Sequence, residues 1–272
     1  MIIGKGMKHV LLVVVFTGIA IGLHQFAPDP LNEGISPSIF YRYNLFIPMI
    51  TINLLLTFGL LALVAGIFVK RMSGNGYQIG LRFGFAFSIL WMLGFLEGSL
   101  YYGSSIKHDI MHGLADGVPM IILLTIWGKV TIRDSVRMKK QSRLFAFVVI
   151  CLFHLCGRYF MYLVLGIDSR VDVKPLQIFI WTVSVGLAIG YIYHVTAESL
   201  QEYSVIKRAS LFSLVIFGID WVLFYSFAPL IQETSLLMNF VRPTLDIIFV
   251  FLGVIVYEKM IELKSCAMHE SR

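Results

Sequence analysis

The sequence has 272 residues, of which 58% are hydrophobic and 14% are charged, and its mean hydropathy is +0.82. Soluble domains contain about 45–50% apolar and about 25% charged residues, so this composition excludes an ordinary water-soluble domain. The formal net charge of +6 arises from basic residues at the ends of hydrophobic runs, and it gives no reason to predict nucleic-acid binding.

Eight almost uncharged runs follow one another along the chain. Each reaches or approaches, with its flanks, the ~20 residues that cross a bilayer. The runs are 11–22, 45–69, 83–103, 118–127, 144–165, 178–193, 211–230 and 245–257. No obvious small-x-small cleavage site follows the first run, so we expect a retained helix and not a signal peptide. The sequence predicts an all-α integral membrane protein with about eight transmembrane helices, in one polytopic domain over residues 1–272.

The placement of Lys and Arg predicts the orientation of these helices. Sixteen of the 22 basic residues fall at helix ends or in loops on one side of the predicted bundle. Four fall on the other side: Arg42, Lys107, Arg170 and Lys174. Cytoplasmic loops of membrane proteins carry an excess of Lys and Arg. Both termini are therefore predicted in the cytoplasm. The membrane would be the cell membrane in a bacterium and an ER-type membrane in a eukaryote.

The longest basic connector divides the chain into two sets of four helices, over residues 1–132 and 143–263. FSIL at 87–90 is similar to FSLV at 212–215, and an intramembrane acid follows each of these segments. Asp116 and Asp246 each lie near the outer end of the last helix of a set, close to a proline. These features predict a 4+4 duplicated bundle, with chance similarity between apolar helices as the alternative.

Seven polar or charged side chains fall inside the predicted helices, where a charge costs ~2.5–3.5 kcal/mol on insertion scales. All seven lie in the middle or outer half of the membrane: Glu97, Asp116, His154, Arg158, Asp220, Arg242 and Asp246. They predict one polar pocket that opens toward the outer leaflet. The alternative is that these groups pair with one another to hold helices together. No acid is expected deep in the inner half, which argues against a path through the membrane.

Aromatic residues accompany the acids. The candidates for substrate binding are Trp91, Tyr101, Trp221 and Tyr225, together with the intramembrane arginines Arg158 and Arg242. An aromatic belt at the membrane interface is the alternative explanation, especially for Tyr101.

A possible metal site is the spacing His-x-x-x-His-x-x-x-Asp at His108, His112 and Asp116, which places three potential ligands on one helical face. His24 or Glu97 could approach it from a neighbouring helix. Spacing alone is weak evidence, because surface histidines are ordinary, so no metal is expected and this set is kept as an alternative.

The third and fourth predicted helices carry a family resemblance. LGFLEGSLYY at 93–102 leads through a short outer loop into GLADGVP at 113–119, and the fourth helix closes with Trp127-Gly128. This arrangement resembles the small integral-membrane terpene cyclases that act on prenylated, often epoxidised, meroterpenoid chains. Leu93 and Leu96 stand where that family has Asn and Trp, and the family usually has seven helices.

The resemblance implies a cofactor-independent cyclase that protonates a lipid-like or isoprenoid substrate. Glu97 and Asp246 would be its acid pair, and Asp116 would orient or share the proton. Asp220 is added as a catalytic candidate from its placement. A proton donor of this kind must stay protonated at neutral pH, which an apolar site favours.

Three other functions stay open. The main alternative is a small-solute or proton-coupled transporter, because duplicated helix sets and intramembrane carboxylates are typical of carriers. The others are a metal-dependent lipid-modifying enzyme and a sensor or assembly factor without catalytic activity.

Overall fold

The structure is a computed structural model that describes residues 5–28, 36–68, 71–131, 144–167 and 170–270. The described residues contain eight helices that are long and apolar enough to cross a membrane, which confirms the predicted all-α integral membrane fold. The helical elements are α1 Lys5–His24, α2 Ile39–Arg42, α3 Phe46–Phe68, α4 Gly76–Tyr101, α5 Ile106–Thr131, α6 Leu144–Leu163, α7 Pro175–Thr196, η2 Ala197–Leu200, α8 Val205–Ser210, η3 Leu211–Phe217, α9 Gly218–Tyr225, α10 Ala228–Ile231 and α11 Leu236–Glu270. The seventh span, Val205–Ile231, combines α8, η3, α9 and α10, and η3 has π-helical hydrogen bonding.

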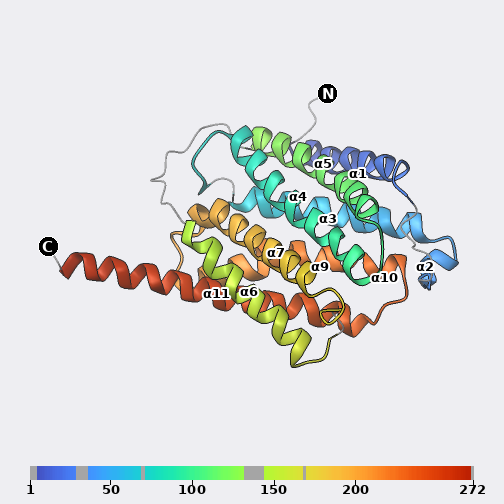
Figure 1. Cartoon of the computed structure of the whole chain (residues 1–272). Helices are drawn as coiled ribbons and strands as arrows, with labels where there is room; N and C mark the ends of the chain where they lie inside the picture. The colour runs from blue at the N-terminus through green and yellow to red at the C-terminus, as the bar shows by residue number, and fades with distance from the viewer. Residues whose placement is uncertain (1–4, 29–35, 69–70, 132–143, 168–169, 271–272) are drawn as a thin grey trace.

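The spans lie side by side, as Figure 1 shows. Helix α4 packs along α5, and α1 covers the other side of α5. Helix α6 packs against both α7 and α11, while α7 also contacts α4, and α9 contacts α3 and α11. The short helices α2 and α10 lie at one end of the bundle, whereas α11 extends beyond the opposite end (Figure 1). The basic connector between the two predicted halves lies mostly outside the described residues, and the duplication stays a prediction.

Small residues allow the closest helix contacts. Gly186 and Gly190 on α7 face α6, where an added Cβ would lie 2.9 Å from the Cα of Cys151 and 2.7 Å from the Cα of Phe147. At Gly84 on α4, the corresponding distance to the Cα of α5 Ile121 is 2.7 Å. Real Cβ atoms do not approach other backbone atoms so closely, so these positions accept no side chain without movement of a helix.

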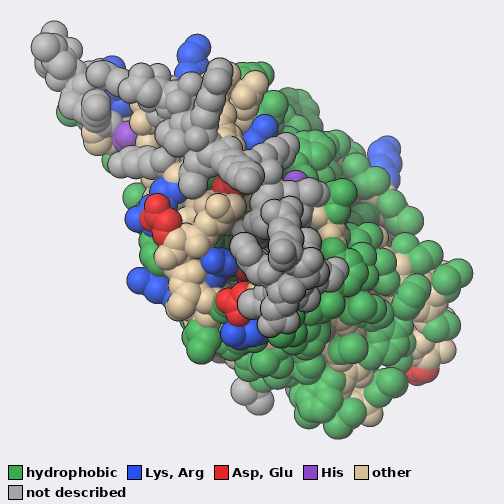
Figure 2. Space-filling view, turned by 90° about the vertical axis from the view of Figure 1, so that its left-hand side faces the viewer, with side chains coloured by type: hydrophobic (Ala, Val, Ile, Leu, Met, Phe, Trp, Pro, Cys, Tyr) green, Lys and Arg blue, Asp and Glu red, His purple; other side chains and the backbone are tan. Residues whose placement is uncertain are grey.

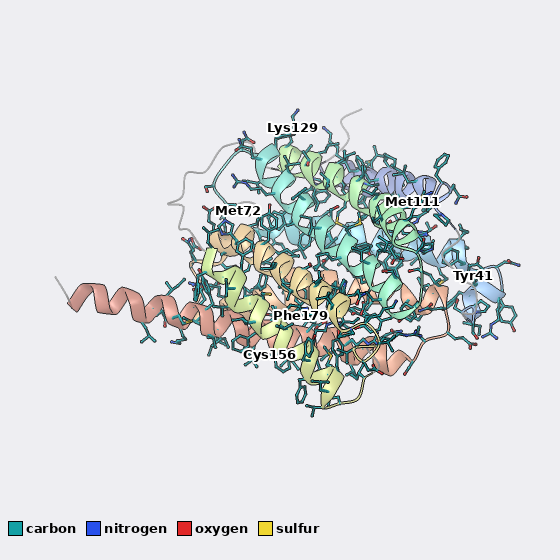
Figure 3. All side chains as sticks on the ribbon, viewed as in Figure 1. Tyr41, Met72, Met111, Lys129, Cys156 and Phe179 are labelled. Atoms are coloured by element: carbon teal, nitrogen blue, oxygen red, sulfur yellow. The ribbon has the colours of Figure 1, made fainter. Side chains whose placement is uncertain are left out.

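The two ends of the bundle differ in charge. Figure 2 looks onto the end from which α11 extends and shows Lys and Arg side chains there, whereas the flanks are largely hydrophobic. Lys129 and Met72 lie toward this end, and Tyr41 lies at the other end (Figure 3). Following the predicted orientation, we call the basic end the inner end and the end with α2 and α10 the outer end.

A buried polar cluster lies toward the inner end. Glu258 of α11 is 2% exposed, accepts a hydrogen bond from the Tyr193 hydroxyl and forms an ion pair with Arg208. Five residues after Tyr193, Glu198 accepts hydrogen bonds from the backbone N–H and the hydroxyl of Ser73. The expectation that no acid lies deep in the inner half was wrong. The hydrophobic run stops at residue 257, whereas α11 continues to Glu270 and buries Glu258.

Candidate functional site

A cavity of about 610 Å³ lies at the outer end of the bundle. The elements around it are the ends of α1 and α4, the starts of α3 and α5, and the segment from α9 to α10. Its polar wall contains His24, Glu97, Ser104, His108, Asp109, His112 and Asp116. Its apolar wall contains Phe46, Ile50, Leu54, Phe95, Phe224 and Phe227. A cavity of this size and mixed lining suits a small amphiphilic molecule.

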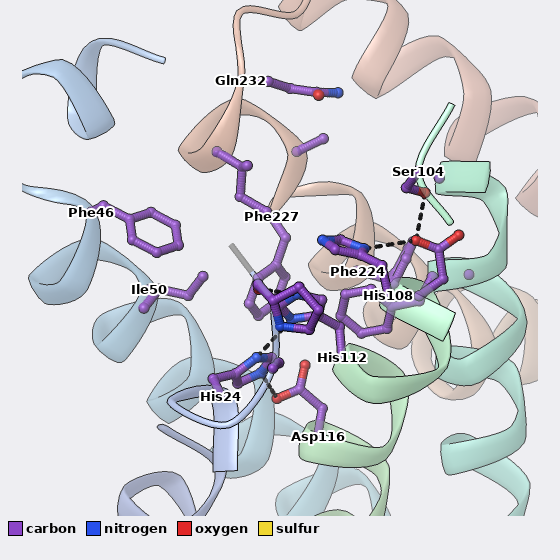
Figure 4. A pocket seen from close by; sticks show the side chains of 18 of the residues that line it. His24, Phe46, Ile50, Ser104, His108, His112, Asp116, Phe224, Phe227 and Gln232 are labelled. Carbon is purple, nitrogen blue, oxygen red and sulfur yellow. Dashed lines mark hydrogen bonds and ion pairs between the residues drawn. The ribbon is translucent and has the colours of Figure 1, made fainter. Parts of the chain in front are cut away.

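Three polar side chains on α1 and α5 form a hydrogen-bonded chain, which we call the histidine chain: Asp116, His24 and His112 (Figure 4). His24 Nε2 lies 2.9 Å from Oδ1 of Asp116, and His24 Nδ1 lies 2.9 Å from Nδ1 of His112. The remaining nitrogen of His112, Nε2, lies 3.1 Å from the carbonyl oxygen of Pro28.

The histidine chain must hold one extra proton. A carbonyl oxygen only accepts, so Nε2 of His112 carries a hydrogen, and one of the two Nδ1 atoms must donate to the other. If His112 donates, it carries hydrogens on both nitrogens and is cationic. If His24 donates, either His24 is cationic or Asp116 carries the proton. In every case the three groups hold one proton more than a carboxylate and two neutral imidazoles, and their summed charge is zero.

One oxygen of Asp116 has no partner in this network. Asp116 is fully buried in the cavity wall, and among the described residues its Oδ2 accepts no hydrogen bond. An unsatisfied buried oxygen costs about 1–3 kcal/mol, so such an atom calls for a ligand or a water molecule.

A second acid–histidine pair shapes the mouth of the cavity. Asp109 accepts hydrogen bonds from the backbone N–H of Ser99 at 2.7 Å and from the hydroxyl of Ser104 at 2.6 Å. Nδ1 of His108 lies 3.1 Å from the same carboxylate. Asp109 thereby ties the end of α4 to the start of α5, and its principal role is to fix this turn.

Next to the cavity lies a fully buried arginine cluster, formed by Arg158, Asp246, Glu97 and Tyr225. Arg158 donates through Nε to Oδ1 of Asp246 at 2.9 Å and through Nη2 to Oδ2 at 2.6 Å. Its Nη1 lies 3.4 Å from Glu97, and its Nη2 also donates to the Tyr225 hydroxyl at 2.8 Å. Such bidentate pairs with further hydrogen bonds are the arrangement that stabilises a buried guanidinium.

Glu97 joins the arginine cluster to the cavity wall. Tyr225 donates to its Oε2 at 2.9 Å, and Nη1 of Arg242 lies 4.0 Å from its Oε1. The guanidinium of Arg242 stacks on the ring of Tyr101 at 5.1 Å. Glu97 therefore faces the cavity with its charge already balanced by arginines behind it.

The sequence-predicted candidates separate into two groups. Glu97, Asp116 and Tyr225 line the cavity. Asp246 and Asp220 are fully buried, and indole N–H groups donate to them: Trp221 to Asp246 and Trp91 to Asp220, both at 2.7 Å. Seven candidates are absent from the cavity lining among the described residues, and they pack between helices: Trp91, Tyr101, Arg158, Asp220, Trp221, Arg242 and Asp246. The four predicted acids thus do not share one cavity.

The geometry does not support the metal-site alternative at His108, His112 and Asp116. Within the described ranges, no group of three or more His, Cys, Asp and Glu side chains is arranged to hold a metal ion. His112 turns its nitrogens toward His24 and Pro28, and His108 turns toward Asp109.

Two cavity residues, His24 and Asp109, had no predicted functional role of their own. His24 was considered only as an extra ligand, and Asp109 was not singled out, because each lies at the border of a hydrophobic run. The sequence nevertheless contained a signal for His24. This histidine follows the first apolar run directly and is followed by Gln25 and Pro28, where an apolar helix is expected to stop.

Comparisons with protein-family models, with curated proteins and with solved structures find no match to this chain. The function must therefore be argued from the cavity itself.

Proposed function

We propose that the chain is a proton-coupled carrier of a small amphiphilic molecule, which would enter the cavity from the outer end. The observation that carries this proposal is the histidine chain, because it must hold a movable proton and it forms part of a cavity wall. Intramembrane carboxylates and histidines are the usual proton-binding groups of pumps and transporters.

Polar contacts toward the inner end support the same proposal. Glu258 of α11 is hydrogen-bonded to Tyr193 of α7 and to Arg208 of α8. When helices separate, hydrogen bonds between polar side chains can be replaced by hydrogen bonds to water. An entirely apolar helix contact cannot be replaced in this way. Alternating access would require this inner cluster to open as the outer cavity closes.

Flux measurements would test the carrier proposal without a known substrate. The purified protein is reconstituted in liposomes loaded with the pH-sensitive dye pyranine. Three external probes share one phenethyl body and differ in charge: phenethylguanidine, phenethyl alcohol and phenethyl phosphate. We expect at least one probe to drive proton movement beyond that of protein-free liposomes. If none does so in either direction of an imposed pH gradient, the carrier proposal is overturned.

A second candidate is the cyclase-type enzyme that the sequence resemblance implies. Glu97 and Asp116, two of the positions that match that family, both line the aromatic cavity, which favours this candidate. Against it, both oxygens of Asp246 accept hydrogen bonds from Arg158, and Asp246 faces no cavity among the described residues. Conversion of an epoxidised farnesyl phenol to a product of equal mass and changed retention would support the enzyme. The absence of conversion would count against it.

A further inference from the structure

Within the described residues, a His–Asp pair joins the first span to the fourth, and another joins the fifth span to the eighth. His24 and Asp116 lie on the first and fourth spans, and His154 and Asp246 lie on the fifth and eighth. Each pair is separated by 92 residues in the sequence. The first histidine is hydrogen-bonded to its aspartate at 2.9 Å, whereas Nδ1 of His154 lies 3.6 Å from Asp246. The same two residue types thus pair between the first and last spans of both sets of four helices, although His24 ends α1 and His154 lies in the middle of α6.

The two aspartates differ in how their charge is balanced. Asp246 receives a guanidinium from Arg158, which follows His154 by four positions and therefore lies one helical turn further along α6. Four positions after His24 stands Pro28, which carries no charge. Asp116 has instead the extra proton of the histidine chain, and its Oδ2 accepts nothing among the described residues.

The pair His154–Asp246 shows how a cation can balance the charge of such an aspartate. With a guanidinium on its aspartate, His154 has neither ring nitrogen in a hydrogen bond within the described residues, although it is fully buried. A cation bound to Asp116 would likewise balance the charge of its carboxylate. The extra proton of the histidine chain would then no longer be needed for that purpose. Arg158 therefore indicates what kind of group the empty Oδ2 of Asp116 would accept.

We propose that the outer cavity binds a guanidinium or ammonium group on Asp116, in exchange for the proton of the histidine chain. The charge balances, because one proton leaves the chain to the outer water as one cation arrives. Phe95, Phe224 and Phe227 line the cavity, and aromatic rings suit both the cation and an apolar body attached to it. This inference rests on the proposed carrier function and names its substrate class: an amphiphilic organic cation.

The other charges around the cavity agree with this class. Glu97, His108 and Asp109 face the same space, and Arg158 and Arg242 lie behind Glu97. The described lining contains three carboxyl groups and neither Lys nor Arg. An anionic head group would meet three carboxyl groups and no Lys or Arg in the described lining, with histidines as the basic groups nearest to it, which disfavours phosphate-bearing ligands.

A binding experiment on the whole purified protein in nanodiscs tests the inference separately from transport. Phenethylguanidine, phenethyl alcohol and phenethyl phosphate are titrated in weak buffer, and proton release is followed with an indicator dye. We expect phenethylguanidine to bind at least about ten-fold more tightly than the other two, a difference equivalent to about 1.4 kcal/mol. Its binding should release about one proton per protein, since the charge of the site must stay balanced.

The variant Asp116→Asn should lose both the preference and the proton release, whereas Asp172→Asn, an exposed carboxyl group in the loop before α7, should keep both. Tighter binding of the alcohol or the phosphate overturns the inference, as does guanidine binding without proton release. The wild-type ranking decides the matter even if Asp116→Asn does not fold. Binding with proton release but without flux would support the cation site and overturn the carrier proposal. Flux with the alcohol or the phosphate alone would support the carrier proposal and overturn the cation site.

Discussion

Nε2 of His24 lies 2.9 Å from Oδ1 of Asp116, and this contact joins the outer end of α1 to α5 across the wall of the cavity. The other ring nitrogen of His24 continues the hydrogen-bonded chain to His112. His24 is thus the central member of the histidine chain in the cavity lining. Its removal separates Asp116 from His112.

The first prediction follows from that central position. The variant His24→Gln should abolish probe-driven proton movement in pyranine-loaded liposomes, because an amide side chain does not take up and release a proton. His9→Gln is the matched control: His9 also lies on α1, but it packs on Trp127 with ring centroids 4.1 Å apart, away from the cavity lining. Equal flux loss in both variants would contradict the role of His24.

The eight spans could be predicted from sequence because a run of about 20 apolar residues is a local property that needs no knowledge of packing. The α6–α7 contact at Gly186 and Gly190 rests on a similarly local feature, since two small residues one turn apart allow backbones to approach. Both features depend on residues that are close together in the chain.

The partners of the buried charges could not be predicted in this way. Asp246 and Glu97 were expected to act together on a substrate, but Arg158 lies between them and engages both. Whether a carboxylate faces a cavity or a guanidinium depends on the rotation of each helix about its axis, which helical spacing alone does not define. Glu258 was missed because hydropathy ends a span at the first charge, whether or not that charge is buried.

A second prediction concerns the stability of the arginine cluster. Replacing Arg158 by Met leaves the buried carboxylates Glu97 and Asp246 without their closest cation. Removal of one partner of a buried ion pair costs about 3–5 kcal/mol, so the unfolding midpoint in detergent should fall sharply. The double variant Arg158→Met/Asp246→Leu should recover a large part of this loss, since the uncompensated charge on Asp246 is gone.

The control for this cluster is an exposed pair. Lys259 and Glu262 lie 2.8 Å apart on α11 and are both more than half exposed. Because surface ion pairs contribute about 0–1 kcal/mol, Lys259→Ala should leave the unfolding midpoint nearly unchanged. A single variant Arg158→Met as stable as Lys259→Ala would show that the cluster does not hold the helices together.

A third prediction tests the close contact between α4 and α5. An alanine Cβ at Gly84 would lie 2.7 Å from the Cα of Ile121, so Gly84→Ala should destabilise the protein by about 1–3 kcal/mol through overpacking. Gly18→Ala on α1 is the matched control, because a Cβ there meets nothing within 4 Å. Thermal unfolding followed by circular dichroism would compare them. An equal change in both variants would contradict the packing of these two helices.

The last prediction concerns the closure of the inner end. The carboxylate of Glu258 connects α11 to Tyr193 of α7 and to Arg208 of α8. Glu258→Gln removes the charge that balances Arg208, so the three helices should separate more often at this end. Ser199 follows α7 and is fully buried, which makes it a suitable position for a reporter cysteine in a background without other cysteines.

Labelling of Ser199→Cys with a membrane-impermeant maleimide in inner-side-out vesicles would measure that opening. In a carrier, we expect the additional change Glu258→Gln to raise the labelling rate by roughly ten-fold, because it removes a charge-assisted contact of about 1.5–3 kcal/mol. Glu262→Gln, an exposed carboxylate one turn further along α11, should leave the rate unchanged. If Glu258→Gln lowers the unfolding midpoint without raising the labelling rate, the inner cluster only stabilises the bundle, and the inner end does not open as the carrier requires.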